Sequence, residues 1–311
     1  MYMRKLLTLA TAGFAAVALA GCGSGDASVG EGSLAGASFV VGAKDFSEQN
    51  ILASLTAQLL AANGADAEPK QITGSVNTRK ALESGEVDLY WEYTGTGWIT
   101  YLKHTTPIGD PEEQYLAVKK EDGAQNAIAW LEPADFNNTY ALAVRREFAE
   151  EKGLASLSDL ASLAKSDPQA VTICVESEFA ARDDGLSGLL KTYGIDVPRQ
   201  QIKTLDTGVI YTETDNGDTC NFGEVFATDG RVANLDLTVL TDDKQFFPVY
   251  QGAPTLQQAT LDEHPEIAQI LAPLAERLDT ETMRRLNAQV DVDGLDADDV
   301  AEKWLEEEGL L

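Results

Sequence analysis

The chain has 311 residues, of which 44% are hydrophobic, and its 23 basic and 51 acidic residues give a formal net charge of −28. A charge of this sign repels phosphate backbones and anionic headgroups, so it argues against nucleic-acid binding and against a polybasic membrane contact. An acidic surface favours solubility and attracts cations in a general way, but it identifies no site.

The N-terminal residues have the pattern of an export signal. Arg4 and Lys5 precede an apolar run over residues 6–20, which is too short to serve as a permanent membrane span. The run ends in LAGC, which resembles the lipobox of bacterial lipoproteins and makes Cys22 the residue to be acylated. We expect a signal peptide over 1–21 and an extracytoplasmic protein held to the bacterial cell membrane by its lipid. The alternative is an ordinary signal peptide with a chance cysteine.

The next part of the chain predicts a tether followed by alternating strands and helices. Residues 22–38 are rich in Gly, Ser and Ala, a composition typical of a flexible tether. The stretch SFVVGAKDF predicts a short strand that ends at Gly42, and Asp45 with Glu48 three residues later predicts the start of a helix. A helix and then a strand ending at Tyr93 are predicted within RKALESGEVDLYWEY.

The same alternation renews from NNTYALAV to FGEVFATDG, and acidic amphipathic helices close the chain. Repeated strand–helix units predict an α/β fold with largely parallel strands. Two such series in one chain indicate two lobes with a cleft between them. Ligands of open sheets bind at the carboxyl ends of strands, so the functional side chains are expected there.

The sequence lacks the common motifs of an enzyme. Its two histidines, His104 and His264, do not have a metal-binding spacing, and no Gly-x-Ser-x-Gly elbow presents a nucleophile. Its carboxylates are scattered over surface-like faces. We therefore predict no enzyme, no metal and no cofactor. A glycosidase with two carboxylates is the open alternative, because such residues need not be close in sequence.

Two cysteines remain once Cys22 is assigned to a lipid. We expect Cys174 and Cys220 to form a disulfide, because an extracytoplasmic compartment permits oxidation. Two free buried thiols are the alternative, since the sequence alone does not place their Cα atoms within bonding range.

Several stretches together resemble the substrate-binding proteins of ABC importers for glycine betaine, choline and related quaternary amines. They occur in the expected order: GAKDFSEQNIL, ESGEVDLYWEYTGTGW, NNTYALAVR, FATDGRV and DDKQFFPVYQGAP. The resemblance implies the two-lobed, type II periplasmic-binding-protein fold, which the chain crosses twice. One lobe would comprise residues 39–137 plus 230–311, and the other residues 138–229.

The resemblance also implies a box of aromatic rings around the ligand's methylated nitrogen. Motif by motif, the box falls on Tyr93, Tyr140, Phe226 and Tyr250; the family usually has tyrosine where this chain has Phe226. A quaternary ammonium has no N–H to donate, and each ring face attracts it by about 0.5–2 kcal/mol. For each ring taken alone, packing at the edge of the core is the alternative.

For the carboxylate of a betaine, the resemblance points to Lys44, Thr96 and Arg182. Glu178, one helical turn before Arg182, is placed to hold the guanidinium, and Asn138 adds a polar contact. The alternative for Glu178 and Arg182 is an ion pair on the surface.

The function implied is that of the solute-binding component of an ABC importer. A monomeric protein would capture glycine betaine, choline or a relative and deliver it to permease and ATPase subunits, as in osmoprotection. Two alternatives stay open: another betaine-like solute, such as carnitine or histidine betaine, and a lipid-anchored receptor module without transport.

Overall fold

The computed structural model describes residues 32–311. The predicted signal peptide, the Cys22 lipidation site and the tether up to residue 31 lie outside the described residues. Within 32–311, none of the helices combines the length and the apolar character needed to cross a bilayer.

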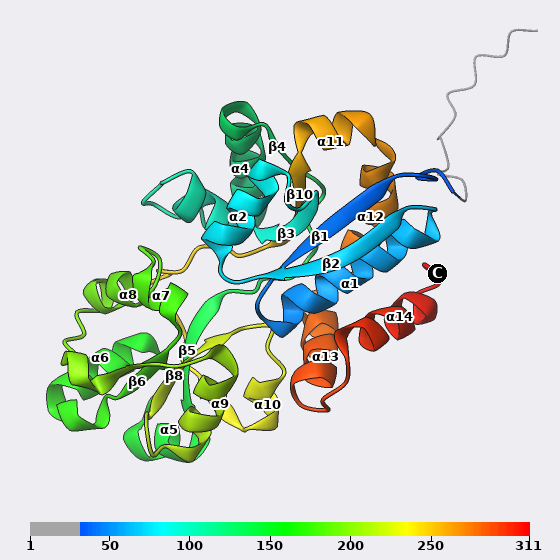
Figure 1. Cartoon of the computed structure of the whole chain (residues 1–311). Coiled ribbons are helices and arrows are strands. Elements are labelled where there is room, and N and C mark those ends of the chain that lie inside the picture. Colours follow the sequence, from blue (N-terminus) through cyan, green and yellow to red (C-terminus); the bar gives the residue numbers. More distant parts are fainter. Residues whose placement is uncertain (1–31) are drawn as a thin grey trace, which may run out of the picture.

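The first sheet has the strand order β2-β1-β3-β10-β4 (Figure 1). β1 pairs in parallel with β2 and β3, whereas β10 enters antiparallel between β3 and β4. A strand from the C-terminal part of the chain thus completes a sheet begun by the N-terminal part. The bounds are Ser38–Lys44 for β1, Asp66–Ile72 for β2, Leu89–Tyr93 for β3, Ile128–Trp130 for β4 and Gly252–Gln257 for β10.

The second sheet has the order β7-β6-β8-β5-β9. β6 is parallel to β7 and β8, whereas β5 is antiparallel to β8 and β9. The expectation of largely parallel strands is confirmed, because four of the five strands in each sheet run in one direction. The exceptions are β10 and β5, the strands that follow directly after a crossing between the sheets. The bounds are Tyr140–Arg145 for β5, Ile173–Val175 for β6, Ile202–Thr204 for β7, Phe222–Phe226 for β8 and Leu237–Val239 for β9.

The helices divide between the two sheets, so that each sheet and its helices form one lobe (Figure 1). With the first sheet lie α1 (Ser47–Ala62), α2 (Ser75–Ser84), α3 (Thr94–Thr96), α4 (Pro111–Asn126), α11 (Gln258–Glu263), α12 (Glu266–Arg277), α13 (Thr280–Asp291) and α14 (Ala297–Glu307). With the second lie α5 (Arg146–Lys152), α6 (Leu157–Ser166), α7 (Ser177–Ala181), α8 (Leu186–Tyr193), α9 (Thr207–Asn216) and α10 (Arg231–Asn234).

The central helix of the first lobe is α1, which packs on β1 and β2 and is covered by α12, α13 and α14. Its apolar residues Ile51, Leu52, Leu55, Leu59 and Leu60 are buried. The helix begins at Ser47 after Phe46, without a side-chain cap, so the predicted start at Asp45 is wrong. Asp45 instead accepts the N–H of Gly74 at 3.0 Å. Glu48 turns inward and is only 3% exposed, because its carboxylate accepts hydrogen bonds from Asn138 and Thr228 near the crossings.

The two crossings between the lobes run side by side. The N–H of Asn138 donates to the carbonyl of Tyr250 at 3.0 Å, and Asn137 and Gln251 form an antiparallel bridge. The sequence prediction ended the second lobe at residue 229. The sheet extends beyond that boundary, because the chain adds β9 as an edge strand before it returns.

The second lobe contains the predicted disulfide. Cys174 in β6 and Cys220, just before β8, are bonded, with their Cα atoms 5.8 Å apart. Both residues are fully buried, next to Ile210 of α9. The bond therefore ties two neighbouring strands within one lobe and leaves the crossings unconstrained.

Candidate functional site

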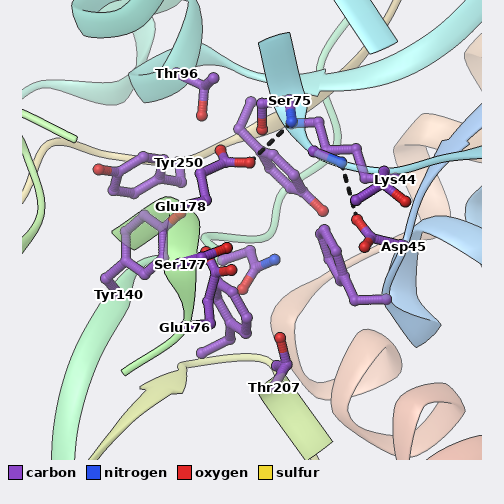
Figure 2. Close-up of a pocket in the computed structure, with 16 residues that line it drawn as sticks. Lys44, Asp45, Ser75, Thr96, Tyr140, Glu176, Ser177, Glu178, Thr207 and Tyr250 are labelled. Carbon is purple, nitrogen blue, oxygen red and sulfur yellow. Dashed lines mark hydrogen bonds between the residues drawn. The ribbon is translucent and has the colours of Figure 1, made fainter. Parts of the chain in front are cut away.

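A cavity of about 110 Å³ lies between the lobes, where strands of both sheets end (Figure 2). Its walls come from the end of β1, the start of α2, the end of β3, α7, β5, β8 and the approach to β10. All but one of the predicted ligand-binding residues line it. Those that line it are Lys44, Tyr93, Thr96, Asn138, Tyr140, Glu178, Phe226 and Tyr250, and the exception is Arg182.

Aromatic rings form a continuous wall around the cavity, which we call the ring box: Phe46, Tyr93, Tyr140, Phe226 and Tyr250. Ring centroids lie 6.4 Å apart between Tyr93 and Phe46, 5.5 Å between Phe46 and Phe226, and 5.2 Å between Phe226 and Tyr140. Tyr250 meets Tyr140 edge-on, also at 5.2 Å. The four predicted rings thus come together, and Phe46 is a fifth that the sequence analysis missed.

Strand register places the rings. Tyr93 is the last residue of β3, and Tyr140, the first of β5, pairs directly with Phe226, the last of β8. Tyr250 reaches the box just before β10 begins, against Gly95 of α3, the short helix that follows β3. A Cβ at position 95 would lie 2.7 Å from the Tyr250 ring, so this close approach requires glycine.

The phenol groups of two rings are fixed from behind. The hydroxyl of Tyr93 donates to Glu48 at 2.8 Å, and that of Tyr250 donates to Asp184 at 2.6 Å. Burial raises the pKa of Tyr93, Tyr140 and Tyr250 well above the ordinary value, so the phenols stay neutral donors. The hydroxyls of Tyr93 and Tyr250 are thus engaged by the protein, and a ligand meets the rings. Protein cations also lie over these rings: Lys44 Nζ is 4.8 Å from the centroid of Tyr93, and Arg182 Cζ is 5.5 Å from that of Tyr140.

Glu178 bridges the lobes across the cavity. From α7 of the second lobe, its carboxylate accepts the N–H of Ser75, at the N-terminus of α2 in the first lobe, at 2.8 Å (Figure 2). It also pairs with Arg182 at 3.1 Å. Burial alone would raise the pKa of Glu178, but the charges of Lys44 and Arg182 and the bonds from Ser75 hold it below its ordinary value. The carboxylate is therefore ionised at neutral pH.

The two predicted cations are already paired with carboxylates. The fork of Arg182 is engaged by Asp184, with Nε and Nη2 at 2.7 and 2.6 Å, and it lies behind the cavity wall. The structure thus does not present this fork to a ligand carboxylate as the sequence analysis expected, because an acid two residues later occupies it. Lys44 lines the cavity, but its Nζ donates to Glu92 at 2.5 Å.

The remaining wall is polar and acidic. Thr96 and Asn138 line it as predicted. Residues that the sequence analysis did not assign also line it: Asp45, Thr73, Gly74, Ser75, Glu176, Ser177 and Thr207. Burial raises the pKa of Glu176 against the hydrogen bonds it accepts at the start of α7. With one lysine against several acids, the wall attracts a cation more strongly than an anion.

One signal in the sequence could have found part of this missed wall. The residues at the end of β1, in the stretch KDF, follow a strand directly and precede a helix, which is where the cleft was expected. Phe46 belongs to that stretch, but it was read only as part of a helix start.

Two lobes that meet over a small, ring-lined cavity, joined by two adjacent crossings, define a solute-binding protein. The chain belongs to the family described as the substrate binding domain of ABC-type glycine betaine transport systems, which matches residues 37–307. Members of this family are substrate-binding, extracytoplasmic components of importers and are not enzymes, in agreement with the prediction from sequence.

Named relatives are similar over most of their length. A glycine-betaine-binding protein of Pseudomonas aeruginosa is 40% identical over 276 residues, which cover 87% of this chain and 88% of the relative. The glycine betaine-binding protein YehZ of Escherichia coli is 35% identical, over 86% and 90% of the two chains. A crystal structure titled glycine betaine/carnitine/choline ABC transporter superposes with a TM-score of 0.71 at 28% identity, over 88% of this chain and 99% of that one. These similarities confirm the predicted two-lobed fold.

Proposed function

We propose that this substrate-binding protein captures a quaternary ammonium solute, with the methylated nitrogen inside the ring box and the polar end toward Thr96, Asn138 and the start of α2. The observation that carries the proposal is the ring box itself, formed by rings from both lobes. A methylated cation is weakly hydrated and cannot donate a hydrogen bond, so several ring faces suit it better than one carboxylate.

The size and charge of the cavity support a small cation or zwitterion. Its volume of about 110 Å³ suits an osmolyte rather than a peptide, and its wall carries Lys44 against Asp45, Glu176 and Glu178. Glycine betaine and choline are the first candidates. Carnitine and ergothioneine follow, because relatives named for their transport are 29% and 33% identical to this chain.

Thermal unfolding in the presence of each solute tests the proposal. At 100 times the dissociation constant, a ligand stabilises the native state by about 2.7 kcal/mol. For a protein of this size, that raises the Tm by roughly 4–5 °C. Glycine, which lacks the methyl groups, is the matched control. The proposal is wrong if none of the four quaternary ammonium solutes raises the Tm more than glycine does.

We further propose that the mature protein is a monomer anchored by a lipid on Cys22, with lobes divided as predicted except that the second extends through β9. Expression of the full chain should place it in the membrane fraction, and Cys22→Ser should release it. Light scattering of the released protein should give the mass of one chain. Equal membrane association of the two forms would contradict the lipid anchor.

A further inference from the structure

Glu48 lies behind the ring box and does not line the cavity. It belongs to the first turn of α1, and its carboxylate accepts four hydrogen bonds from neutral donors. Oε1 accepts from the hydroxyl of Tyr93 at 2.8 Å and from Asn138 at 2.9 Å. Oε2 accepts from the hydroxyl of Thr228 at 2.5 Å and from Asn287 at 2.9 Å.

Within residues 32–311, no lysine, arginine or histidine nitrogen lies within 4.0 Å of this carboxylate. Two other buried carboxylates that accept tyrosine hydroxyls differ in this respect: Asp184 accepts from Tyr250, and Glu92 from Tyr90 and Tyr101, which lie outside the cavity wall. Asp184, behind Tyr250, is paired with Arg182 at 2.6 Å, and Glu92 is paired with Lys44 at 2.5 Å. An unpaired buried charge is costly, so burial raises the pKa of Glu48, and the hydrogen bonds from Thr228, Asn287 and Tyr93 oppose this rise. An arriving cation therefore stabilises the ionised form of this carboxylate.

Tyr93 connects this charge to the cavity. Its hydroxyl points to Glu48, while its ring lines the site. Donating a hydrogen bond to a carboxylate polarises the phenol, since bonds in such a chain strengthen one another in a low-dielectric interior. Electron density moves toward the ring, and the ring face becomes more attractive to a cation. The ligand thus contacts the carbon atoms of the Tyr93 ring, and the carboxylate of Glu48 lies on the other side of that ring, at its hydroxyl.

We propose that Glu48 is the counter-charge of the bound cation, acting through Tyr93, and that it makes the site prefer a permanent cation over an uncharged molecule of the same shape. The inference rests on the proposed function. Glu48 is a positioning residue, because the carboxylate itself does not contact the ligand.

A purely structural role for Glu48 is the rival explanation. Its donors Asn138 and Thr228 flank β5 and β8 near the crossings, and Asn287 belongs to α13, so the carboxylate also holds the crossings together. Loss of that role would weaken every ligand by the same factor. Loss of the counter-charge would weaken only cations, so a pair of ligands that differ only in charge separates the two.

The experiment compares choline and glycine betaine with their tert-butyl analogues, in which carbon replaces the charged nitrogen. Dissociation constants are measured by calorimetry for the wild-type protein and for Glu48→Gln. Competition experiments are used for the analogues that bind more weakly. Glutamine keeps the shape and can accept the bond from Tyr93. We expect roughly a three- to tenfold loss for the cations and less than a twofold change for the analogues.

A second variant, Tyr93→Phe, removes the relay and keeps the carboxylate, so the test does not depend on the folding of Glu48→Gln alone. Tyr93→Phe should show the same selective loss of affinity for the cations. The double variant Glu48→Gln, Tyr93→Phe should lose little more affinity than either single variant, because the two residues act as one unit. Equal losses for cations and analogues, or unchanged cation affinity, overturn the inference while leaving the proposed function intact. A wild type that binds no quaternary ammonium solute overturns both.

Discussion

The bridge that Glu178 makes between the lobes predicts a measurable effect on closure. Glu178→Gln keeps an oxygen that can accept the N–H of Ser75, but it removes the charge that faces the N-terminus of α2 and the guanidinium of Arg182. Both partners favour an anion, so the substitution should destabilise the closed arrangement of the lobes relative to the open one.

The size of the effect follows from the contacts. A hydrogen bond to a charged group contributes about 1.5–3 kcal/mol, and one between neutral groups about 0.5–1.5 kcal/mol. The difference is on the order of 1 kcal/mol, and the side chain of Glu178 is only 25% exposed, so solvent screens little of it. The closed population should fall about fivefold relative to the open one. The apparent dissociation constant for choline should rise by up to the same factor.

Two measurements check this prediction. Small-angle scattering or a fluorophore pair, one on each lobe, reports closure, and calorimetry reports affinity. The matched control is Glu68→Gln, which removes the same charge from the exposed strand β2. The loss should be smaller for glycine betaine, whose own carboxylate can take the vacated position at α2. If Glu178→Gln and Glu68→Gln give the same lobe separation and the same choline affinity, the bridge does not stabilise closure.

The pH dependence has a definite sign. The pKa of Glu178 lies below its ordinary value. Burial raises this pKa, but the charges of Lys44 and Arg182 lower it by more than burial raises it. A carboxylate with a depressed pKa contributes fully above its ordinary value and loses its contribution only as the pH falls through the depressed one. Closure by this bridge should therefore persist into mildly acidic solution, and Glu178→Gln should lack that titration step.

Further predictions concern the ring box, the buried ion pair and the disulfide. Tyr140→Ala should abolish binding of both choline and glycine betaine in calorimetry, because this ring touches two others of the box; retained affinity for either would show that the box is not the site. Arg182→Ala should lower the free energy of unfolding by about 3–5 kcal/mol, since it leaves the buried Asp184 unpaired. It should also weaken the two ligands alike; a loss confined to glycine betaine would instead support direct binding of the carboxylate. Reduction of the Cys174–Cys220 bond, whose residues are 46 apart, should lower stability to urea by up to about 4 kcal/mol with little change in affinity. An equally large loss of affinity would show that the bond shapes the cavity.

The positions of the box rings could be predicted because they depend on local chain geometry. A residue at the end of a buried strand must lie at the edge of its sheet, and Tyr93, Tyr140 and Phe226 do so. Which rings meet depends on strand pairing, and the family resemblance supplied that information. Phe46 was missed because a single residue between a strand and a helix has no periodic pattern of its own.

The electrostatic partners could not be predicted in the same way. Glu178 and Arg182 are one helical turn apart, and the structure contains their ion pair, but the sequence does not show that Asp184 folds back to take the guanidinium fork. The inward turn of Glu48 likewise depends on donors that are up to 239 residues away in the chain. Tertiary packing determines which partner each of these side chains has, because a carboxylate accepts a hydrogen bond from any donor that packing brings within reach.

The insertion of β10 between β3 and β4 has a consequence for biosynthesis. The strands of the second sheet lie within residues 140–239, so in a chain that emerges from its N-terminus they are all available before Gly252–Gln257. Until then, β3 and β4 each keep a row of unpaired backbone groups facing an empty slot. The later-encoded half is thus free to mature first, while the half that starts the chain waits for its last strand. This interval is when a nascent chain is most exposed to mispairing and most dependent on chaperones.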